Sequence, residues 1–386
     1  MEIQASVGQA FALDGREASA KASRDALREF DSSSVSIAFI FASHEYDPQA
    51  VLTGVMSQLG TAPAIGLSTT GEITKEGSQH RSVTVALLSG KELQARSEWE
   101  PNSPSGLSIG KLVNSLSERN EKGDLMLVTD GVNGIEDSYF SSLSSRQSTI
   151  FGCAASGDIP GGESSQLGGS KFGSGGVAGA FISGARIGVG ISHGWQPVGA
   201  SFEVTKAGNN LVRSLDGKPA SESYSRLLGY STTEWGIPPL NTLVRLYPLG
   251  LERENGSPLQ VRTPMWVEAD GSLRMNATVR DGGVGHMLVG SREKCVVAAQ
   301  EAAKEALAAI GGSKPALALI MADVSWQILL EGQSGSEVRA VQDVLGANVP
   351  IAGGYTFGQI GRNADSGKVE MFNQHIEVVV ISEDEK

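Results

Sequence analysis

Cysteine and charged side chains are scarce in this sequence of 386 residues. The two cysteines, Cys153 and Cys295, lie far apart, and neither belongs to a CxxC pair. The sequence therefore gives no basis for a zinc site or a disulfide framework, and a reduced cytoplasmic compartment is the default expectation. Charged residues make up 19%, which is below the roughly 25% of ordinary soluble domains. This composition indicates a folded chain with small-residue packing rather than a disordered one.

Long apolar runs and a basic leader are also missing. The longest apolar runs, such as VSIAFIF and ALALIM, have the length of strands and are too short to cross a bilayer. The N-terminus, MEIQASVGQAFALDG, has no basic region followed by an apolar run, so we expect no signal peptide. The formal net charge of −12 repels phosphate backbones and anionic lipids. We therefore expect neither nucleic acid nor a membrane as a partner.

Catalytic motifs are absent or incomplete. The segment from Gly66 to Gly71 is one residue too long for the G-x-S-x-G nucleophile elbow, and no histidine is tied to Ser68 by spacing. Cys153 stands among glycine and alanine, a setting more typical of a small buried hydrophobe than of a nucleophile. GVGISH at 188–193 lacks the last glycine of a dinucleotide-binding turn. A hydrolase that uses Ser68 or Cys153 remains a less favoured alternative to a protein that is not an enzyme.

The five histidines are scattered along the chain, so they do not predict a metal site. Heme needs no more than one axial histidine, and heme therefore remains an alternative to a protein without a cofactor. His44 follows the end of a predicted strand, and two others lie in glycine-rich turns; these two are His193 and His286. His375 is the most interesting of the five, because it stands beside a glycine-rich motif.

Glycine, in contrast, is abundant, with 49 residues against a usual share of about 7%. Three glycine segments resemble one another, namely IGLSTTGEI at 65–73, IFGCAASGDI at 150–159 and IAGGYTFGQI at 351–360. In each segment two glycines stand five positions apart, and Glu, Asp or Gln follows the second glycine. This self-similarity predicts an internal repeat.

The flanks of the glycine segments repeat as well. An apolar strand precedes each segment, at 35–47, 124–134 and 316–326, and another follows, at 82–90, 175–184 and 376–382. A short helix lies between the first strand and the segment, for example after Asp47, with Pro48 at its start and Gly60 past its end. We predict three β-α-β-α-β-β units in an α/β (α+β) fold, with mixed, largely antiparallel sheets covered by helices.

The third unit is predicted to begin with the strand SLRMNATV at 272–279 and a helix that Ser291 caps and Gly311 ends. Cys295 falls on the alanine-rich face of this helix, which predicts a core position. An irregular section at 185–271, rich in turns, separates the second and third units. We expect a long hairpin across 186–206 within it.

At this point the sequence resembles the FIST domain family. GLSTTGEI and GGYTFGQIG look like the family's paired glycine-rich motifs, and GWQPVGASFEVTKAGNNLVRSLDGKPASESYSRLLG looks like the start of the FIST C-terminal domain. LYPLGL, MNATVRDGGVGHMLVGSREK and FNQHIEV continue the likeness in the same order. The resemblance covers about residues 4–383. It implies a FIST N-terminal domain at 1–184 and a C-terminal domain at 185–386, the latter with the irregular section at 185–271 and the third repeat at 272–386.

The resemblance also implies a function. FIST proteins are regarded as bacterial and archaeal sensory modules that bind small ligands, with amino acids as a proposed class, and some members bind heme. They pass signals to kinases, chemotaxis receptors or cyclic-dinucleotide enzymes. Because the resemblance uses the whole chain, we expect the signalling partner to be a separate protein. Departures from the family pattern at Cys153, Gln359 and His375 put the ligand choice in doubt.

Several polar and aromatic residues are candidates for ligand binding. Hydroxyls beside a glycine suit a small polar molecule, although they also suit an ordinary turn, and Glu72 could hold an ammonium group. Asp323 and Trp326 follow a strand end, where α/β sheets tend to bind ligands. Equivalent loops of a repeated fold tend to meet at one face, so we expect a cleft lined by the N- and C-terminal motifs. The predicted ligand-binding residues are Ser68, Thr69, Thr70, Gly71, Glu72, Asp323, Trp326, Tyr355, Thr356, Gly358, Gln359 and Asn373.

Overall fold

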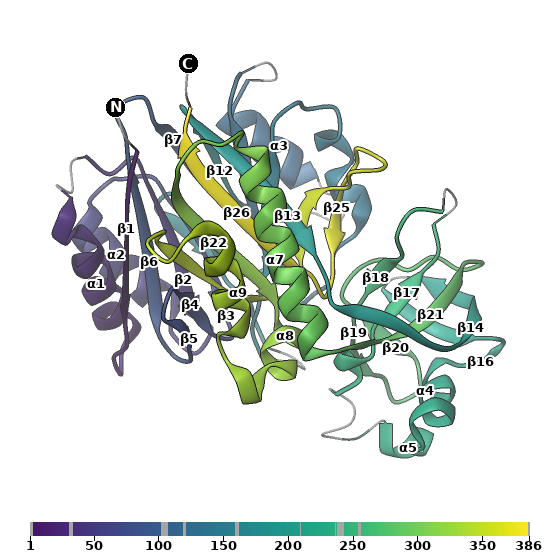
Figure 1. Ribbon diagram of the computed structural model, residues 1–386. Helices are drawn as coiled ribbons and strands as arrows, with labels where there is room; N and C mark the ends of the chain where they lie inside the picture. The colour runs from purple at the N-terminus through teal and green to yellow at the C-terminus, as the bar shows by residue number, and fades with distance from the viewer. Residues whose placement is uncertain are drawn as a thin grey trace.

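Three six-stranded sheets form the larger part of the molecule, which we call the body (Figure 1). The computed structural model describes residues 3–30, 34–101, 107–118, 121–158, 162–208, 210–235, 237, 243–253 and 256–384. The first sheet has the order β1 (Gln4–Ala10), β6 (Val83–Ser89), β2 (Ile37–Ser43), β3 (Ala64–Thr69), β10 (Gln166–Gly168), β11 (Lys171–Gly173). The second has the order β7 (Gln94–Pro101), β12 (Gly176–Ser183), β8 (Asp124–Asp130), β9 (Ile150–Ala155), β24 (Gln359–Arg362), β25 (Val369–Phe372). The third has the order β13 (Ala185–Ser192), β26 (Ile376–Glu383), β22 (Pro315–Asp323), β23 (Ile351–Thr356), β4 (Glu72–Thr74), β5 (Gly77–Gln79).

Each of these sheets has one parallel pair at its centre. The parallel pairs are β2 with β3, β8 with β9, and β22 with β23, and the other pairs are antiparallel. Each of these sheets ends in a hairpin whose strands follow, along the chain, the parallel pair of another sheet. For example, β4–β5 follows the β2–β3 pair of the first sheet, but β4 pairs with β23 of the third sheet. The predicted mixed and largely antiparallel α/β fold is confirmed. The sequence repeat itself stays a prediction.

Helices cover the outer faces of the three sheets. The first sheet carries α1 (Gly15–Ala26) with the short η1 (Leu27–Glu29), and α2 (Pro48–Leu59) packs on α1. The second carries α3 (Leu107–Leu116), and η3 (Asp137–Leu143) contacts β25. The third carries α7 (Arg292–Ala309), α9 (Ser336–Leu345) and the short α8 (Val324–Leu329) and η5 (Glu331–Gln333). Among the described residues, no helix is both long enough and apolar enough to cross a membrane.

The predicted helix ends follow from capping chemistry. The carboxylate of Asp47 accepts a hydrogen bond from the Ala50 backbone N–H at 2.7 Å, and α2 ends at Gly60, which has a φ of 63°. The hydroxyl of Ser291 accepts from the Lys294 N–H at 3.2 Å and caps α7. These boundaries agree with the sequence prediction.

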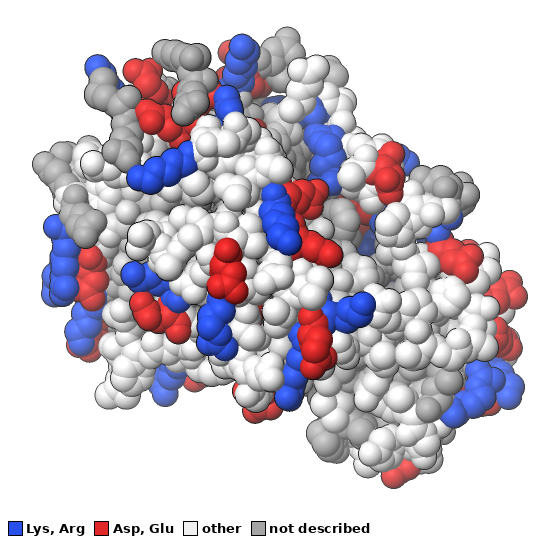
Figure 2. All heavy atoms as spheres, viewed as in Figure 1, with Lys and Arg blue, Asp and Glu red and all other residues white. Residues whose placement is uncertain are grey.

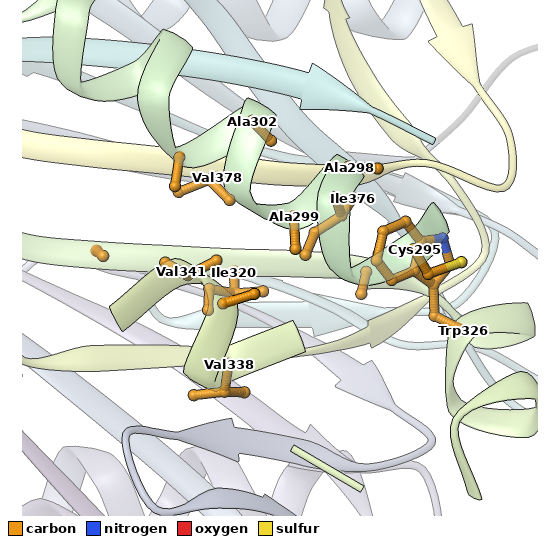
Figure 3. Packing of buried hydrophobic residues seen from close by; sticks show 14 of the residues in the cluster. Cys295, Ala298, Ala299, Ala302, Ile320, Trp326, Val338, Val341, Ile376 and Val378 are labelled. Atoms are coloured by element: carbon orange, nitrogen blue, oxygen red, sulfur yellow. The ribbon is translucent and has the colours of Figure 1, made fainter. Parts of the chain in front are cut away.

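Small residues bring α7 close to the third sheet. Cys295 and a row of alanines on α7 lie against β22 and β26 in one buried cluster, as predicted for Cys295 (Figure 3). Glycines on β13 make the approach possible, because a Cβ at Gly188 would lie 2.1 Å from the Ala306 carbonyl oxygen. The opposite face of β13, with Ile187, turns into the core between the sheets.

A smaller unit, which we call the module, is inserted between β13 and α7 (Figure 1). It comprises residues 195–290 and has its own eight-stranded sheet and hydrophobic core. Its elements are β14 (Trp195–Gly208), β15 (Leu211–Leu215), β16 (Lys218–Pro219), α4 (Ala220–Leu228), α5 (Thr232–Trp235), η4 (Val244–Leu246), β17 (Leu249–Leu251), β18 (Gln260–Arg262), β19 (Pro264–Val267), β20 (Leu273–Met275) and β21 (Val284–Gly290).

Two sequence predictions about this region are wrong. The segment 186–206 is not a hairpin, because β13 pairs with β26 in the body whereas β14 pairs with β15 and β21 in the module. SLRMNATV does not begin the third unit, since only Leu273–Met275 is a strand and it lies in the module. The edge strand of the third sheet, which pairs with β26, is β13, and its alternating glycines fit under α7. Both β13 and the segment 272–279 have strand-like sequence patterns, so a local pattern could not show which of them pairs with β26.

Candidate functional site

The three glycine segments meet inside the body. The backbone N–H of Thr70 donates to the Tyr355 carbonyl at 3.3 Å, and the Tyr355 N–H donates to the Gly71 carbonyl at 3.0 Å. Ser156, within the second segment, joins both of the others, because its hydroxyl donates to the Tyr355 carbonyl at 2.7 Å and its carbonyl accepts from the Ser68 hydroxyl at 2.7 Å. We call this contact the glycine junction.

Glu72 is buried at the glycine junction and its two oxygens already have partners. One oxygen accepts from the Thr69 hydroxyl at 2.6 Å, and the other accepts from the N–H and the hydroxyl of Ser82, both at 2.8 Å. Burial raises the pKa of Glu72 to about 7, although these hydrogen bonds oppose the shift. The fully buried carboxyl group ties the end of β3 to the start of β6.

Ser68 and Cys153 do not have the surroundings of nucleophiles. The Ser68 hydroxyl donates to the Ser156 carbonyl and accepts from the Ser165 N–H at 2.8 Å, and no histidine of the described chain bonds to it. Cys153 is fully buried, and burial raises the pKa of its thiol well above the usual value. A protonated thiol without solvent access is a poor nucleophile.

Four other predicted residues surround Gln374, a residue with a φ of 67°. Asp323 caps α8 and also accepts from the Gln374 N–H at 3.1 Å, and the indole N–H of Trp326 donates to the Gln374 carbonyl at 2.8 Å. With its amide oriented to satisfy its neighbours, Gln359 donates to the carbonyls of Phe372 and His375. The Asn373 side chain reaches into the module, where its oxygen accepts from the Thr263 N–H at 3.4 Å.

The remaining predicted residues also serve the protein's own contacts. The Gly358 carbonyl accepts from the Ala154 N–H at 2.9 Å, the Thr356 hydroxyl lies 3.4 Å from the Ala322 carbonyl, and the Thr70 hydroxyl donates to Gln327. Thr70 is half-buried and the other eleven predicted residues are buried. None of the twelve lines the groove described next, and Ser68 lines a cavity of about 30 Å³. Direct ligand contact by these residues stays a prediction.

A larger cavity lies where the module meets the body. This groove has a volume of about 700 Å³, and we call it the His-pair groove. Its walls are β13 with α7, the β24–β25 hairpin, the loop at 147–150 and the module segment 258–262. Its lining includes Ile187, Val189, Ile191, His193, Arg253, Leu259, Val261, Arg262, Glu305, Arg362, Asn363, Met371, Phe372 and His375.

Two histidines stand next to each other in this groove. The rings of His193 and His375 are 4.6 Å apart between centroids and are T-shaped, and the ring of Phe372 lies 5.3 Å from that of His375. His193 Nδ1 is 3.2 Å from the Trp195 backbone nitrogen, and His375 Nδ1 is 2.6 Å from the Asn373 carbonyl oxygen. Asn373, one of the predicted residues, thus orients a groove residue instead of lining the groove.

Both histidines are neutral at pH 7. Burial lowers the pKa of His193. Burial, followed by the neighbouring His193, lowers the pKa of His375 well below its usual value. A neutral imidazole can donate at one nitrogen and accept at the other.

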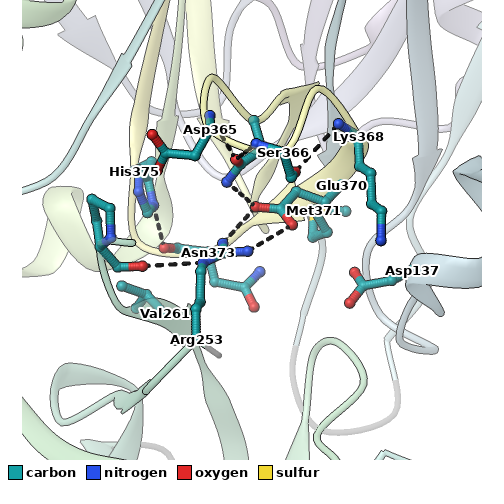
Figure 4. A network of polar contacts seen from close by, with 12 residues as sticks. Asp137, Arg253, Val261, Asp365, Ser366, Lys368, Glu370, Met371, Asn373 and His375 are labelled. Atoms are coloured by element: carbon teal, nitrogen blue, oxygen red, sulfur yellow. Dashed lines mark hydrogen bonds and ion pairs between the residues drawn. The ribbon is translucent and has the colours of Figure 1, made fainter. Parts of the chain in front are cut away.

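Arginine contacts join the module to the body beside the histidines (Figure 4). The Arg253 guanidinium donates to both oxygens of Glu370, at 2.6 and 3.2 Å, and Asn363 donates to the same carboxylate. The fully buried Arg262 donates to the Met371 carbonyl at 2.9 Å and to Asp137 at 2.7 Å. These contacts hold one wall of the groove against the β24–β25 hairpin.

A buried carboxyl group lies two residues beyond His375. Glu377 accepts from the Gly152 N–H at 3.1 Å, while its other oxygen has no hydrogen-bond partner within the described chain. Burial raises the pKa of Glu377 well above its usual value. Its surroundings are apolar and include Ile191 and Phe372, which line the groove.

Sequence analysis singled out His375 but missed most of the groove. It placed His193 in an ordinary turn and did not consider Arg253, Phe372 or Glu370. These residues come from three separate segments whose proximity depends on the module folding back on the body. A possible signal was the set of polar residues on both sides of the predicted strand 376–382.

Family models match most of this chain. The model described as the FIST N domain matches residues 36–218, and the model described as the FIST C domain matches residues 220–362. No curated protein matches significantly. One solved structure, a cyanuric acid hydrolase from A. caulinodans, aligns over 99% of this chain and 100% of its own, with 9% identity and a TM-score of 0.33. A second, also described as a cyanuric acid hydrolase, aligns over the full length of both chains with 9% identity and a TM-score of 0.32. These TM-scores are too low to support an argument about fold or function.

Proposed function

Because the chain belongs to the FIST family, whose members have a sensory role, we propose that it binds a small polar ligand in the His-pair groove. One observation supports this choice above the others. Two neighbouring imidazoles, His193 and His375, each have Nδ1 hydrogen-bonded to backbone and a second ring nitrogen without a partner among the described residues. The groove combines apolar side chains, such as Ile187 and Val189, with fixed polar groups, and a concave site with fixed polar groups suits a small polar ligand.

The position of the groove supplies a way to pass on a signal. His193 lies two residues before Trp195, where the chain enters the module, whereas His375 belongs to the body. A ligand that contacts both residues therefore favours one position of the module over others. We propose that a separate signalling protein in the cytoplasm, of the kinase, chemotaxis or cyclic-dinucleotide type, reads this position.

The glycine junction has a supporting role in this proposal. Asp323, Trp326 and Gln359 hold the chain around Gln374, and Asn373 orients His375. Ser68, Glu72 and Tyr355 join the sheets on which these residues stand. Substitution of these residues is expected to weaken ligand binding through the position of His375.

A thermal-shift screen of amino acids, their derivatives and other small polar metabolites tests the proposal, followed by calorimetry on each hit. His375→Ala is expected to abolish the shift. His80→Ala is the matched control, because His80 is exposed and does not line the groove. A hit that survives His375→Ala and His193→Ala but is lost in Glu72→Gln would move the site to the glycine junction.

Heme is the second candidate, and one observation favours it. His375 donates its Nδ1 proton to a backbone carbonyl, as metal-bound histidines do, and its Nε2 is left with a lone pair. His193 does not fit as a second ligand at Nε2, because its Nδ1 accepts a hydrogen bond and Nε2 carries the proton. Heme titration of the purified protein is the test. A Soret band that disappears in His375→Ala would support heme, and no band at saturating heme would exclude it.

A further inference from the structure

The hydrogen bonds behind the two histidines determine which ring nitrogen carries the proton. A backbone N–H can only donate, so His193 Nδ1 accepts from Trp195 and, in the neutral ring, Nε2 carries the hydrogen. A carbonyl can only accept, so His375 Nδ1 carries the hydrogen and Nε2 has the lone pair. The two neighbouring rings therefore offer one donor, His193 Nε2–H, and one acceptor, His375 Nε2.

Neither Nε2 atom has a hydrogen-bond partner in the part of the chain that the structure describes. His375 is 8% exposed. Neither Nε2 is among the described buried atoms that lack a partner, so both nitrogens are open to the groove and pair with solvent until a ligand replaces it. The rings are 4.6 Å apart between centroids, so a ligand beside one ring also lies beside the other.

Two arginines beside the histidines are paired with carboxylates, Arg253 with Glu370 and Arg262 with Asp137. The guanidinium of Arg362 donates to backbone carbonyls, among them those of Gly367 and Arg146. Glu305 accepts from the Ile191 N–H, and Asp365 also lines the groove. The groove lining therefore carries charges of both signs and does not present a cluster of one sign to the histidines.

The donor and acceptor pattern favours a ligand edge that both donates and accepts. A carboxylate by itself has only acceptors, so it satisfies His193 Nε2–H but not His375 Nε2. An ammonium group by itself has only donors, so it satisfies only His375 Nε2. A group with an N–H and a carbonyl side by side satisfies both nitrogens, as the two ends of an amino-acid zwitterion could, but without charges that must lose water on binding. The Phe372 ring beside His375 and the apolar side chains of the lining, such as Val189 and Ile191, suit a flat molecule.

We infer that the His-pair groove binds a neutral, planar cyclic amide or ureide, whose N–H donates to His375 Nε2 and whose adjacent carbonyl accepts from His193 Nε2. This inference rests on the proposed function, namely that the groove is the ligand site. It replaces the amino-acid class implied by the family resemblance with a class that carries no charge at the recognised edge.

Isothermal titration calorimetry with four probes tests the ligand class. The probes are uracil, hydantoin, 2-piperidone and hypoxanthine, each of which has an N–H beside a carbonyl. At least one is expected to bind. N-methylation of that probe at the amide is expected to weaken binding at least about tenfold, because one hydrogen bond to a buried group is lost. This comparison leaves the protein unchanged, so it does not depend on the folding of a variant.

Variants of the protein then locate the site. His375→Ala and His193→Ala are each expected to weaken binding by about tenfold or more, and His80→Ala is expected to leave it unchanged. Circular dichroism checks that each variant is folded.

Two results separate the inference from the proposed function. If an amino acid or carboxylate binds in a His375-dependent manner and none of the cyclic amides does, the ligand class is wrong and the groove remains the site. If cyclic amides bind His375→Ala and His193→Ala as tightly as the unchanged protein, both the ligand class and the groove as the ligand site are overturned. The same holds if no small molecule of the screen or the probe set binds in a way that depends on these histidines.

Discussion

Arg253 and Glu370 link the module to the body through two parallel hydrogen bonds, at 2.6 and 3.2 Å. Their side chains are 20% and 9% exposed, so the pair is partly shielded from water. The contact lies at the wall of the His-pair groove, because Arg253 is one of its lining residues. The face of the molecule seen in the view of Figure 1 carries charges of both signs intermixed (Figure 2). A change at this pair can therefore affect both stability and the position of the module.

Removal of the Arg253 side chain is expected to destabilise the protein. In Arg253→Ala the buried Glu370 carboxylate loses its charged partner, and the free energy of unfolding should fall by about 1–3 kcal/mol. Urea denaturation measures the change. Lys218→Ala is the control, since the Lys218–Glu222 pair is exposed and should contribute about 0–1 kcal/mol. Equal effects of the two substitutions would show that the module does not depend on Arg253.

Glu72 is expected to make stability depend on pH. Its pKa rises from the usual 4.5 to about 7 on folding, so between these values the folded state holds a proton that the unfolded state has released. Stability should therefore decrease as pH rises from about 4.5 to 7, by about 3 kcal/mol in total. Glu72→Gln supplies a neutral amide that can donate to Thr69 and accept from Ser82, so it should flatten this part of the curve. Urea denaturation from pH 5 to 8 makes the comparison, and identical curves for both proteins would contradict it.

The indole N–H of Trp326 is expected to matter more than that of Trp195. Both side chains are buried in the same cluster, 6.1 Å apart. Trp326 donates to the Gln374 carbonyl, whereas Trp195 Nε1 has no partner within the described chain. Trp326→Phe should therefore cost about 1–3 kcal/mol more than Trp195→Phe in chemical denaturation, beyond the similar loss of volume. A larger loss of stability in Trp195→Phe than in Trp326→Phe would mean that the hydrogen bond from Trp326 to Gln374 contributes little to stability.

Close packing of α7 on β13 predicts a position-specific effect of added methyl groups. In Gly188→Ala the new Cβ would meet the Ala306 carbonyl, so the variant should lose about 1–3 kcal/mol of stability. Gly283→Ala is the control, because nothing lies within 4 Å of a Cβ there, and it should stay within about 0.5 kcal/mol. Thermal melting of both variants checks the difference, and an unchanged melting temperature for Gly188→Ala would contradict the packing described.

The ring tautomers can be measured directly. Nitrogen-15 NMR of histidine-labelled protein should show the proton on Nε2 of His193 and on Nδ1 of His375. Because burial and the neighbouring ring lower the pKa of His375 well below its usual value, its signals should not titrate near pH 6.5, unlike those of a free histidine. Protonation of His375 near pH 6.5, or the opposite tautomer in either ring, would contradict this assignment.

Local patterns in the sequence predicted most elements of the body. The apolar runs that became β2, β8 and β22 are buried strands, and Asp47, Pro48 and Gly60 mark the ends of α2. Such features depend on neighbours in the chain, so a sequence contains them in full. The placement of β13 and of 272–279 failed, because both segments have strand-like patterns and only the partner β26 distinguishes them.

The candidate site was predictable only in part. The sequence by itself determined the family, the fold class and the three glycine segments, and it predicted a role for the region around Asn373 and His375. The tertiary structure decided that His193 lies beside His375, because the module between β13 and α7 folds back and carries Arg253 to Glu370. It also decided which ring nitrogens stay free, because that depends on backbone groups of Trp195 and Asn373 that no side-chain pattern encodes.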